Sequence, residues 1–207
     1  EFVHWPLYSS LALDAAAIPA RSELFNYLPG GTVSGAGAGA TTATLLHTNM
    51  QAVRSIPRPK TFLISGIRVY VPPVAFTTTV ALADDTAGTT EENIDQLDDL
   101  RSITETMALR LRIGEITFAE APLWMMPANL SVGGVAASSV HANASVIWQN
   151  RVALSTAGIG YDFSTGRRPV LWASQNLQCE LLCDWTTNPT LADAKLLTVV
   201  LDGVMGR

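Results

Sequence analysis

Apolar and polar residues alternate along most of the chain beyond residue 41. Between residues 60 and 73, Ile67, Val69 and Val71 alternate with polar or aromatic neighbours, and the run ends at two prolines. A two-residue period places successive side chains on opposite faces of a β-strand, one toward the core and one away from it. Further runs rich in β-branched and aromatic residues predict strands within 76–82, 107–127, 144–154, 167–174, 176–185 and 194–205.

One segment has a helical period instead. Thr89 and Glu92 fit a capping box, and acidic residues crowd the first turns after them. The apolar side chains that follow fall near one face of a helix: Ile94, Leu97, Leu100 and Ile103. About seven to nine strands with one short helix indicate an all-β antiparallel β-sandwich and not a βαβ fold.

The segment 107–127 contains a break in its alternation. The two-residue period holds up to Ile113, is interrupted at Gly114, and resumes at Ile116 and Phe118. This pattern fits two strands joined by a tight turn, and it equally fits one bulged strand. The small and polar segment 128–145 is typical of a long loop.

The first 40 residues show no clear period. Bulky apolar side chains occur there in irregular order, and a short helix within 12–28 would be broken by Pro19. The stretch GTVSGAGAGATTATLL, residues 31–46, follows them, and chains rich in glycine, serine and alanine behave as flexible linkers. We therefore expect a flexible N-terminal arm and tether over residues 1–40 and a β-sandwich domain over residues 41–207.

The glycine-rich stretch does not fit a nucleotide-binding loop. A P-loop needs lysine and Ser/Thr after its last glycine, but Gly39 is followed by Ala40 and Thr41. A dinucleotide fingerprint needs a buried strand before it, whereas a Pro-Gly-Gly turn precedes this stretch. A hinge between an interacting arm and a sandwich body explains the glycines better.

Composition changes the expected surface. Hydrophobic residues make up 48% of the 207 residues and charged residues only 15%, against about 25% charged residues in typical domains. Much of the surface must therefore be neutral, as is common where other subunits cover it. The net charge of -5 argues against a general nucleic-acid binder. No apolar run is long enough to cross a membrane, and residues 1–22 lack the pattern of a secretory signal.

Residues suited to catalysis or metal binding do not converge in a motif. The histidines His4, His47 and His141 lie in unrelated contexts, and no nucleophile elbow occurs. The acidic run from Asp84 to Asp99 fits a solvated helix start better than a calcium loop, because it lacks alternating ligands. We expect no catalytic residues, no metal, no cofactor, no enzymatic activity and no small-molecule substrate.

The two cysteines are Cys179 and Cys183. Residues four apart on one strand lie on the same face about 13 Å apart, which exceeds the Cα separation of about 7 Å that a disulfide permits. We expect both thiols to be reduced and buried as small hydrophobic groups.

The tryptophans favour an alternative function. Many sandwiches are lectins, and Trp124, Trp148, Trp172 and Trp185 are candidates for a sugar-binding platform. The last three lie in strand-like apolar runs, so core packing is the stronger interpretation for them. The alternative to a structural protein is therefore a lectin-like or receptor-binding β-sandwich module.

Three segments carry a resemblance to a known group. The succession PKTFLISGIRVYV, LRLRIGEITFAEAPLWMMPA and LLTVVLDGVMGR resembles the jelly-roll coat proteins of tailless icosahedral bacteriophages, over roughly residues 56–207. The resemblance implies an eight-stranded jelly roll, self-assembly into capsomers, terminal arms that lock neighbours together, and no catalytic residues. The length fits a single jelly roll with an arm better than a double one.

The resemblance implies a structural virion protein, a capsid or capsid-associated subunit that is assembled in the host cytoplasm and located in the virion. Its partners would be identical subunits and other virion proteins, and the arm could also reach an internal membrane or the genome. Arginine suits interfaces because its planar fork makes paired bonds; on an outer strand face, it pairs with acids there or across an interface. The candidate subunit-interface residues are Trp5, Tyr8, Phe25, Tyr27, Arg68, Arg110 and Arg112.

Overall fold

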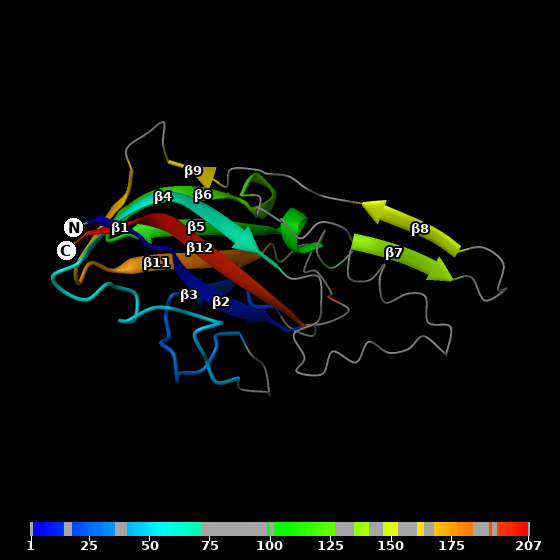
Figure 1. Cartoon of the computed structure of the whole chain (residues 1–207), viewed down its shortest axis with the longest axis horizontal. Helices are drawn as coiled ribbons and strands as arrows, with labels where there is room; N and C mark the ends of the chain where they lie inside the picture. The colour runs from blue at the N-terminus through cyan, green and yellow to red at the C-terminus, as the bar shows by residue number, and fades with distance from the viewer. Residues whose placement is uncertain are drawn as a thin grey trace.

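The computed structural model describes residues 2–14, 18–35, 41–71, 99, 102–126, 161–163, 168–183, 191 and 194–206, with backbone alone for 135–140 and 147–152. The described chain is mostly β-structure, arranged in two antiparallel sheets with apolar side chains between them (Figure 1). The prediction of an antiparallel all-β sandwich is therefore confirmed.

The first sheet is centred on two long strands, β4 and β12, which pair with each other. On the side away from β4, the C-terminal end of β12 pairs with β1 and the N-terminal part of β12 pairs with β2. On the side away from β12, β4 likewise pairs with two short strands, β9 and β10. The six strands are β1 (Phe2–His4), β2 (Leu7–Leu13), β4 (Thr61–Tyr70), β9 (Tyr161–Asp162), β10 (Val170–Trp172) and β12 (Lys195–Gly206).

The second sheet has the order β3-β11-β5-β6. Its strands are β3 (Arg21–Leu24), β5 (Met107–Ile113), β6 (Ile116–Pro122) and β11 (Leu177–Cys183). A 3-10 turn, η1 (Leu123–Met125), follows β6. A separate hairpin of β7 (Val135–Val140) and β8 (Ile147–Val152) lies beyond the end of the sheets that is opposite the two chain termini (Figure 1). Because β7 lies within 128–145, the prediction of a long loop there is wrong for that strand.

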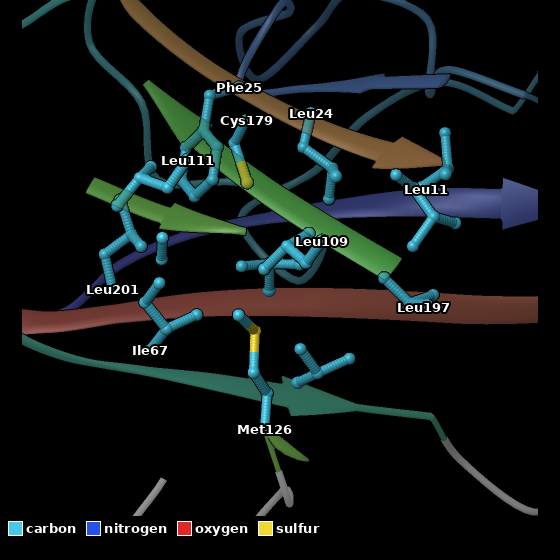
Figure 2. Packing of buried hydrophobic residues seen from close by; sticks show 14 of the residues in the cluster. Leu11, Leu24, Phe25, Ile67, Leu109, Leu111, Met126, Cys179, Leu197 and Leu201 are labelled. Atoms are coloured by element: carbon cyan, nitrogen blue, oxygen red, sulfur yellow. The ribbon is translucent and has the colours of Figure 1, made fainter. Parts of the chain in front are cut away.

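Alternation builds the core. Every second residue of β5 is buried, as is nearly every second residue of β12, and these side chains face each other between the sheets. Figure 2 shows Leu109 and Leu111 of the second sheet meeting Leu197 and Leu201 of the first. The strand predictions for 60–73, 107–127, 144–154, 167–174, 176–185 and 194–205 are confirmed by β4, β5 with β6, β8, β10, β11 and β12. The segment 76–82 lies outside the described residues.

A bulge in β4 keeps apolar side chains on both sides of it directed toward the core. Asp202 pairs with Gly66 and Gly203 pairs with Ile64, so Ser65 is an extra residue without a counterpart on β12. This extra residue lets Ile64 and Ile67, three positions apart, both face the core and both be fully buried. Without the bulge, the two-residue period would turn one of them outward.

The turn at Gly114 joins β5 to β6. Gly114 has a φ of 59°, a conformation that favours glycine, and the two strands pair antiparallel on either side of it. The register also shifts between Leu111 and Arg112. The segment is therefore a hairpin across a tight turn, and one of its strands also carries a bulge.

The N-terminal segment belongs to the sandwich. β2 pairs with β12 from Leu7 through Leu13, and β3 pairs with β11 in the other sheet. Leu7, Leu11, Leu13 and Leu24 are all buried in the main core. The prediction of a flexible arm over residues 1–40, separate from a body over 41–207, is therefore wrong for these strands. Residues 36–40 of the expected tether lie outside the described part of the chain.

The segment after β3 covers the outer face and the edge of β2. Tyr27, Val33 and Ala43 pack against Ala12 and Leu196 in a second, smaller cluster. Along the edge, the backbone N–H of Ser10 donates to the carbonyl of His47 at 2.8 Å. The edge strand is thus shielded from pairing with another chain over this stretch.

The predicted helix is described only at its end. Asp99 and residues 102–106 are helical, and Ile103 is fully buried. The expected capping box at Thr89 and Glu92 lies outside the described residues.

Candidate subunit-interface surfaces

The outer face of the second sheet carries a row of paired charges. The strand register places Glu23, Glu180, Arg110 and Glu120 side by side across β3, β11, β5 and β6. Arg110 donates from Nε to Glu120 Oε2 at 3.0 Å and from Nη2 to Oε1 at 2.8 Å. Its Nη1 lies 3.8 Å from Glu180 Oε2. Glu180 also pairs with Arg21, and Glu23 pairs with Arg54, so each charged residue of this row has a partner of opposite charge in the same chain.

The pairing shifts the two ends of the Arg110–Glu120 bond in opposite directions. The hydrogen bond from Arg110 lowers the pKa of Glu120, and the same bond to Glu120 raises the pKa of Arg110. Both groups lie near the surface, so solvent screens much of this interaction.

Glu180 is the buried member of the row. Its side chain is 1% exposed although it points away from the core, because Arg21 and Arg110 lie against it. A buried carboxylate needs charged partners to offset its desolvation. The two arginines therefore bridge β3, β11 and β5 on the outer side of the sheet.

Arg112 and Arg68 also have acidic partners in the chain. Arg112 Nη2 lies 3.7 Å from Glu115 Oε2. Arg68 makes a bidentate contact with Asp202, at 2.5 Å from Nε and 2.6 Å from Nη2, beside the bulge in β4. Of the two pairings expected for the arginines, the one with acids on the same face is therefore found. Contact of these side chains with a neighbouring subunit stays a prediction.

Two of the four predicted aromatic contact residues lie inside the chain's own cores. Phe25 has no exposed surface and packs in the main cluster. The Tyr27 hydroxyl donates to the carbonyl of Ser10 at 2.5 Å, and its burial raises the pKa of the phenol. The prediction that Phe25 and Tyr27 present surface to another subunit is wrong, because the Phe25 side chain is in the main core and the Tyr27 side chain packs against β2.

The other two aromatic candidates differ. Tyr8 is half-buried, and its hydroxyl donates to the carbonyl of Leu45. Trp5 is 42% exposed and borders a groove of about 250 Å³ that Met50, Ile56 and Met205 also line. Trp5 is thus the one member of the aromatic set with a large open surface.

An apolar patch lies at the end of the first sheet that holds the termini. The register places Phe2, Gly206, Thr61 and Trp172 in one row across β1, β12, β4 and β10. This row faces away from the core, since the adjacent Phe62 is fully buried. Phe2 is 79% and Trp172 is 60% exposed. With the half-buried aliphatic residues of the next outward row, the apolar patch consists of Phe2, Leu63, Val170, Trp172 and Val204.

The sequence interpretation missed this patch. Trp172 was expected in the core because it lies in an apolar strand-like run, but it occupies the outward position at the end of β10. Its alternation with the fully buried Leu171 is the signal that places it outside. Trp124 in η1 is also largely exposed, whereas the side chains of Trp148 and Trp185 lie outside the described part of the structure.

The thiols lie as predicted. Cys179 and Cys183 are thiols, not a disulfide, and both are buried on the inner face of β11. Burial in apolar surroundings raises the pKa of the Cys179 thiol far above its ordinary value. These two side chains therefore pack as core residues.

The described residues do not converge on a metal site. Among them, no group of three or more His, Cys, Asp and Glu side chains is placed to hold a metal ion. Within the same residues, no helix is long and apolar enough to cross a membrane. Comparison of the chain with models of known families, with curated proteins and with solved structures finds no match.

Proposed function

We infer that the sandwich is a single jelly roll. Without the separate hairpin of β7 and β8, the strand positions along the chain are β1 with β2, then β3, β4, β5, β6, β9 with β10, β11 and β12. The first position pairs with the last, the second with the seventh, the third with the sixth and the fourth with the fifth. This nested pairing is that of a long hairpin wound into two sheets, as in the jelly rolls of capsid and lectin domains.

We propose that the chain is a structural virion protein, a capsid or capsid-associated subunit that assembles with identical copies. The nested strand order is the observation that carries the proposal, because it agrees with the fold that the resemblance implies. A fold alone does not define a function, so the surface must also support assembly.

Two surface features support assembly. Charged residues make up only 15% of the chain, and the arginines named above pair with acids of their own chain. The apolar patch presents Phe2 and Trp172 to solvent on one sheet face, at the two ends of a row that also holds Gly206 and Thr61. Exposed aromatic patches on soluble proteins commonly mark contact sites. In this proposal, the virion is the location of the protein and identical subunits are its main partners.

The oligomeric state tests the proposal. We expect the purified chain to form a large homo-oligomer or shell, visible by negative-stain electron microscopy and by light scattering after size exclusion. Protein that stays monomeric over a wide range of concentration and salt would contradict it.

A lectin-like or receptor-binding module is the second candidate, because Trp172 and Trp124 expose broad aromatic surfaces. Saccharides often bind on such rings. Specific binding of a glycan by the isolated monomer, lost in Trp172→Ala or Trp124→Ala, would favour this candidate over a capsid protein.

A further inference from the structure

Lys195 and Asp99 form an ion pair inside the sandwich. Lys195 Nζ lies 3.1 Å from Asp99 Oδ2, and the two side chains are 0% and 3% exposed. Lys195 is the first residue of β12, and Asp99 is a helical residue of the connection between β4 and β5. The pair therefore joins two segments that are far apart in the sequence.

The described neighbours of the pair on β12 and β2 are apolar. Lys195 has the same facing as Leu197 on β12, and it is paired in register with Leu13 of β2. Both leucines are buried in the main core, as is Ile103, four residues after Asp99. The amine and the carboxyl group are thus held next to each other in a site with little access to water.

A buried ion pair has a neutral alternative. Removing an ammonium and a carboxylate from water commonly costs as much as their mutual attraction returns. Transfer of one proton from Nζ to Oδ2 makes both groups neutral without changing the total charge. The result is a primary amine, which is a nucleophile, held at contact distance from a carboxylic acid.

The use of lysine at this position is informative. The chain has 11 arginines and only two lysines, Lys60 and Lys195. The ion pairs on the outer sheet faces use arginine, whose guanidinium keeps its proton, whereas the ε-amine of lysine is a nucleophile in its neutral form. The fully buried pair therefore has the side chain that can act as a nucleophile.

We propose that Lys195 and Asp99 condense to an intramolecular amide, a cross-link between β12 and the β4–β5 connection. The neutral Nζ attacks Cγ of the protonated Asp99 carboxyl group and forms a tetrahedral carbon. The bond from Cγ to the hydroxyl oxygen then breaks, and this oxygen leaves as water with a proton from the nitrogen. The other oxygen becomes the amide carbonyl, so the products are one amide and one water molecule, without any oxidant or reductant.

The cross-link would stabilise the fold as a disulfide does. It closes a long loop of the chain and so reduces the freedom of the unfolded state. The cysteines Cys179 and Cys183 form no disulfide and do not supply such a link. The amide also removes both buried charges permanently.

The intact mass of the denatured full chain tests the cross-link. We expect a mass lower than that of the linear sequence by one water molecule. Trypsin should fail to cleave after Lys195 and should release a branched peptide that joins Asp99 to Lys195. In the denatured protein, an amine-reactive label should modify Lys60 and leave Lys195 unmodified.

Variants show whether the mass deficit of one water molecule comes from Lys195. Lys195→Met, which has no amine, should restore the full mass, and the control Lys60→Met should keep the deficit. The wild-type measurement decides the matter even if Lys195→Met does not fold. A wild-type chain of full mass that trypsin cleaves after Lys195 overturns the proposal, as does a water deficit that persists in Lys195→Met.

Discussion

Ser65 and Gly203 determine how the two central strands of the first sheet meet. Ser65 is the extra residue of the bulge, and Gly203 is the buried residue of β12 beside it. A Cβ atom at position 203 would lie 2.3 Å from the carbonyl oxygen of Leu63 and 2.6 Å from the ring of Phe62. Only glycine allows this close approach of the two backbones.

We expect Gly203→Ala to destabilise the fold by about 1–3 kcal/mol, because the added methyl group must displace backbone and ring atoms. Urea denaturation followed by tryptophan fluorescence measures this loss. Val204→Ala, at the half-buried outward position next to it, is the control and should cost less. Equal effects of the two substitutions would contradict the close approach at Gly203.

The Arg110–Glu120 pair predicts a pH dependence. Because the pKa of Glu120 in the fold is below its ordinary value of 4.5, the pair stabilises the fold above that pH. This contribution is lost as pH falls through the lower, folded pKa. We expect Glu120→Gln to remove this part of the acid-induced loss of stability, measured as the free energy of unfolding between neutral pH and about pH 3. If wild type and variant lose stability in parallel, Glu120 does not contribute.

At the scale of elements, β2 has an unusual position. Its inward side chains enter the main core, and its outward side chains are covered by the segment that contains Tyr27 and Val33. Its free edge is met by residues 47–49. A strand buried on both faces does not alternate between apolar and polar residues, and Ser9 and Ser10 are both fully buried here.

Because β2 is a core strand, Leu11→Ala should cost about 2–5 kcal/mol of stability. Leu46→Ala, at a leucine that is 85% exposed, should have almost no effect on the same denaturation curve.

Deletion of residues 1–40 should abolish folding, measured by circular dichroism and thermal unfolding. A truncated protein that still folds cooperatively would show that residues 1–40 are an arm and not part of the core.

At the scale of the whole molecule, the outer faces of the two sheets differ. The second sheet presents a row of paired charges, whereas the first presents the apolar patch beside both termini. Under the proposed function, the apolar patch is the surface that an assembly would bury, because its exposed aromatic side chains gain most from leaving water.

We therefore expect the double variant Phe2→Ser with Trp172→Ser to reduce the fraction of large assemblies strongly, at unchanged unfolding midpoint of the monomer. Light scattering and electron microscopy measure the first quantity, and thermal unfolding measures the second. Trp124→Ser changes an equally exposed tryptophan outside the patch and serves as the control. Normal assembly of the double variant would exclude the patch as a subunit contact.

The sequence by itself determined the strands that alternate. β4, β5, β6, β11 and β12 each carry a local two-residue period, which follows from the pleat of a single strand and needs no partner to be visible. The buried, separate thiols of Cys179 and Cys183 follow from the same local geometry, whereas the break at Gly114 fitted both a turn and a bulge until the pairing of β5 with β6 showed the turn. For these features, the side-chain pattern and the observed structure agree.

The tertiary structure alone decided which segments are neighbours. The pairing of β2 with β12, the acidic partner of Arg68 and the contact of Lys195 with Asp99 each join residues that are far apart in the chain. No local period encodes such contacts, because they depend on how the sheets wind around a common core. The N-terminal strands were missed for this reason: burial on both faces of β2 removed the alternation that would have shown it as a strand.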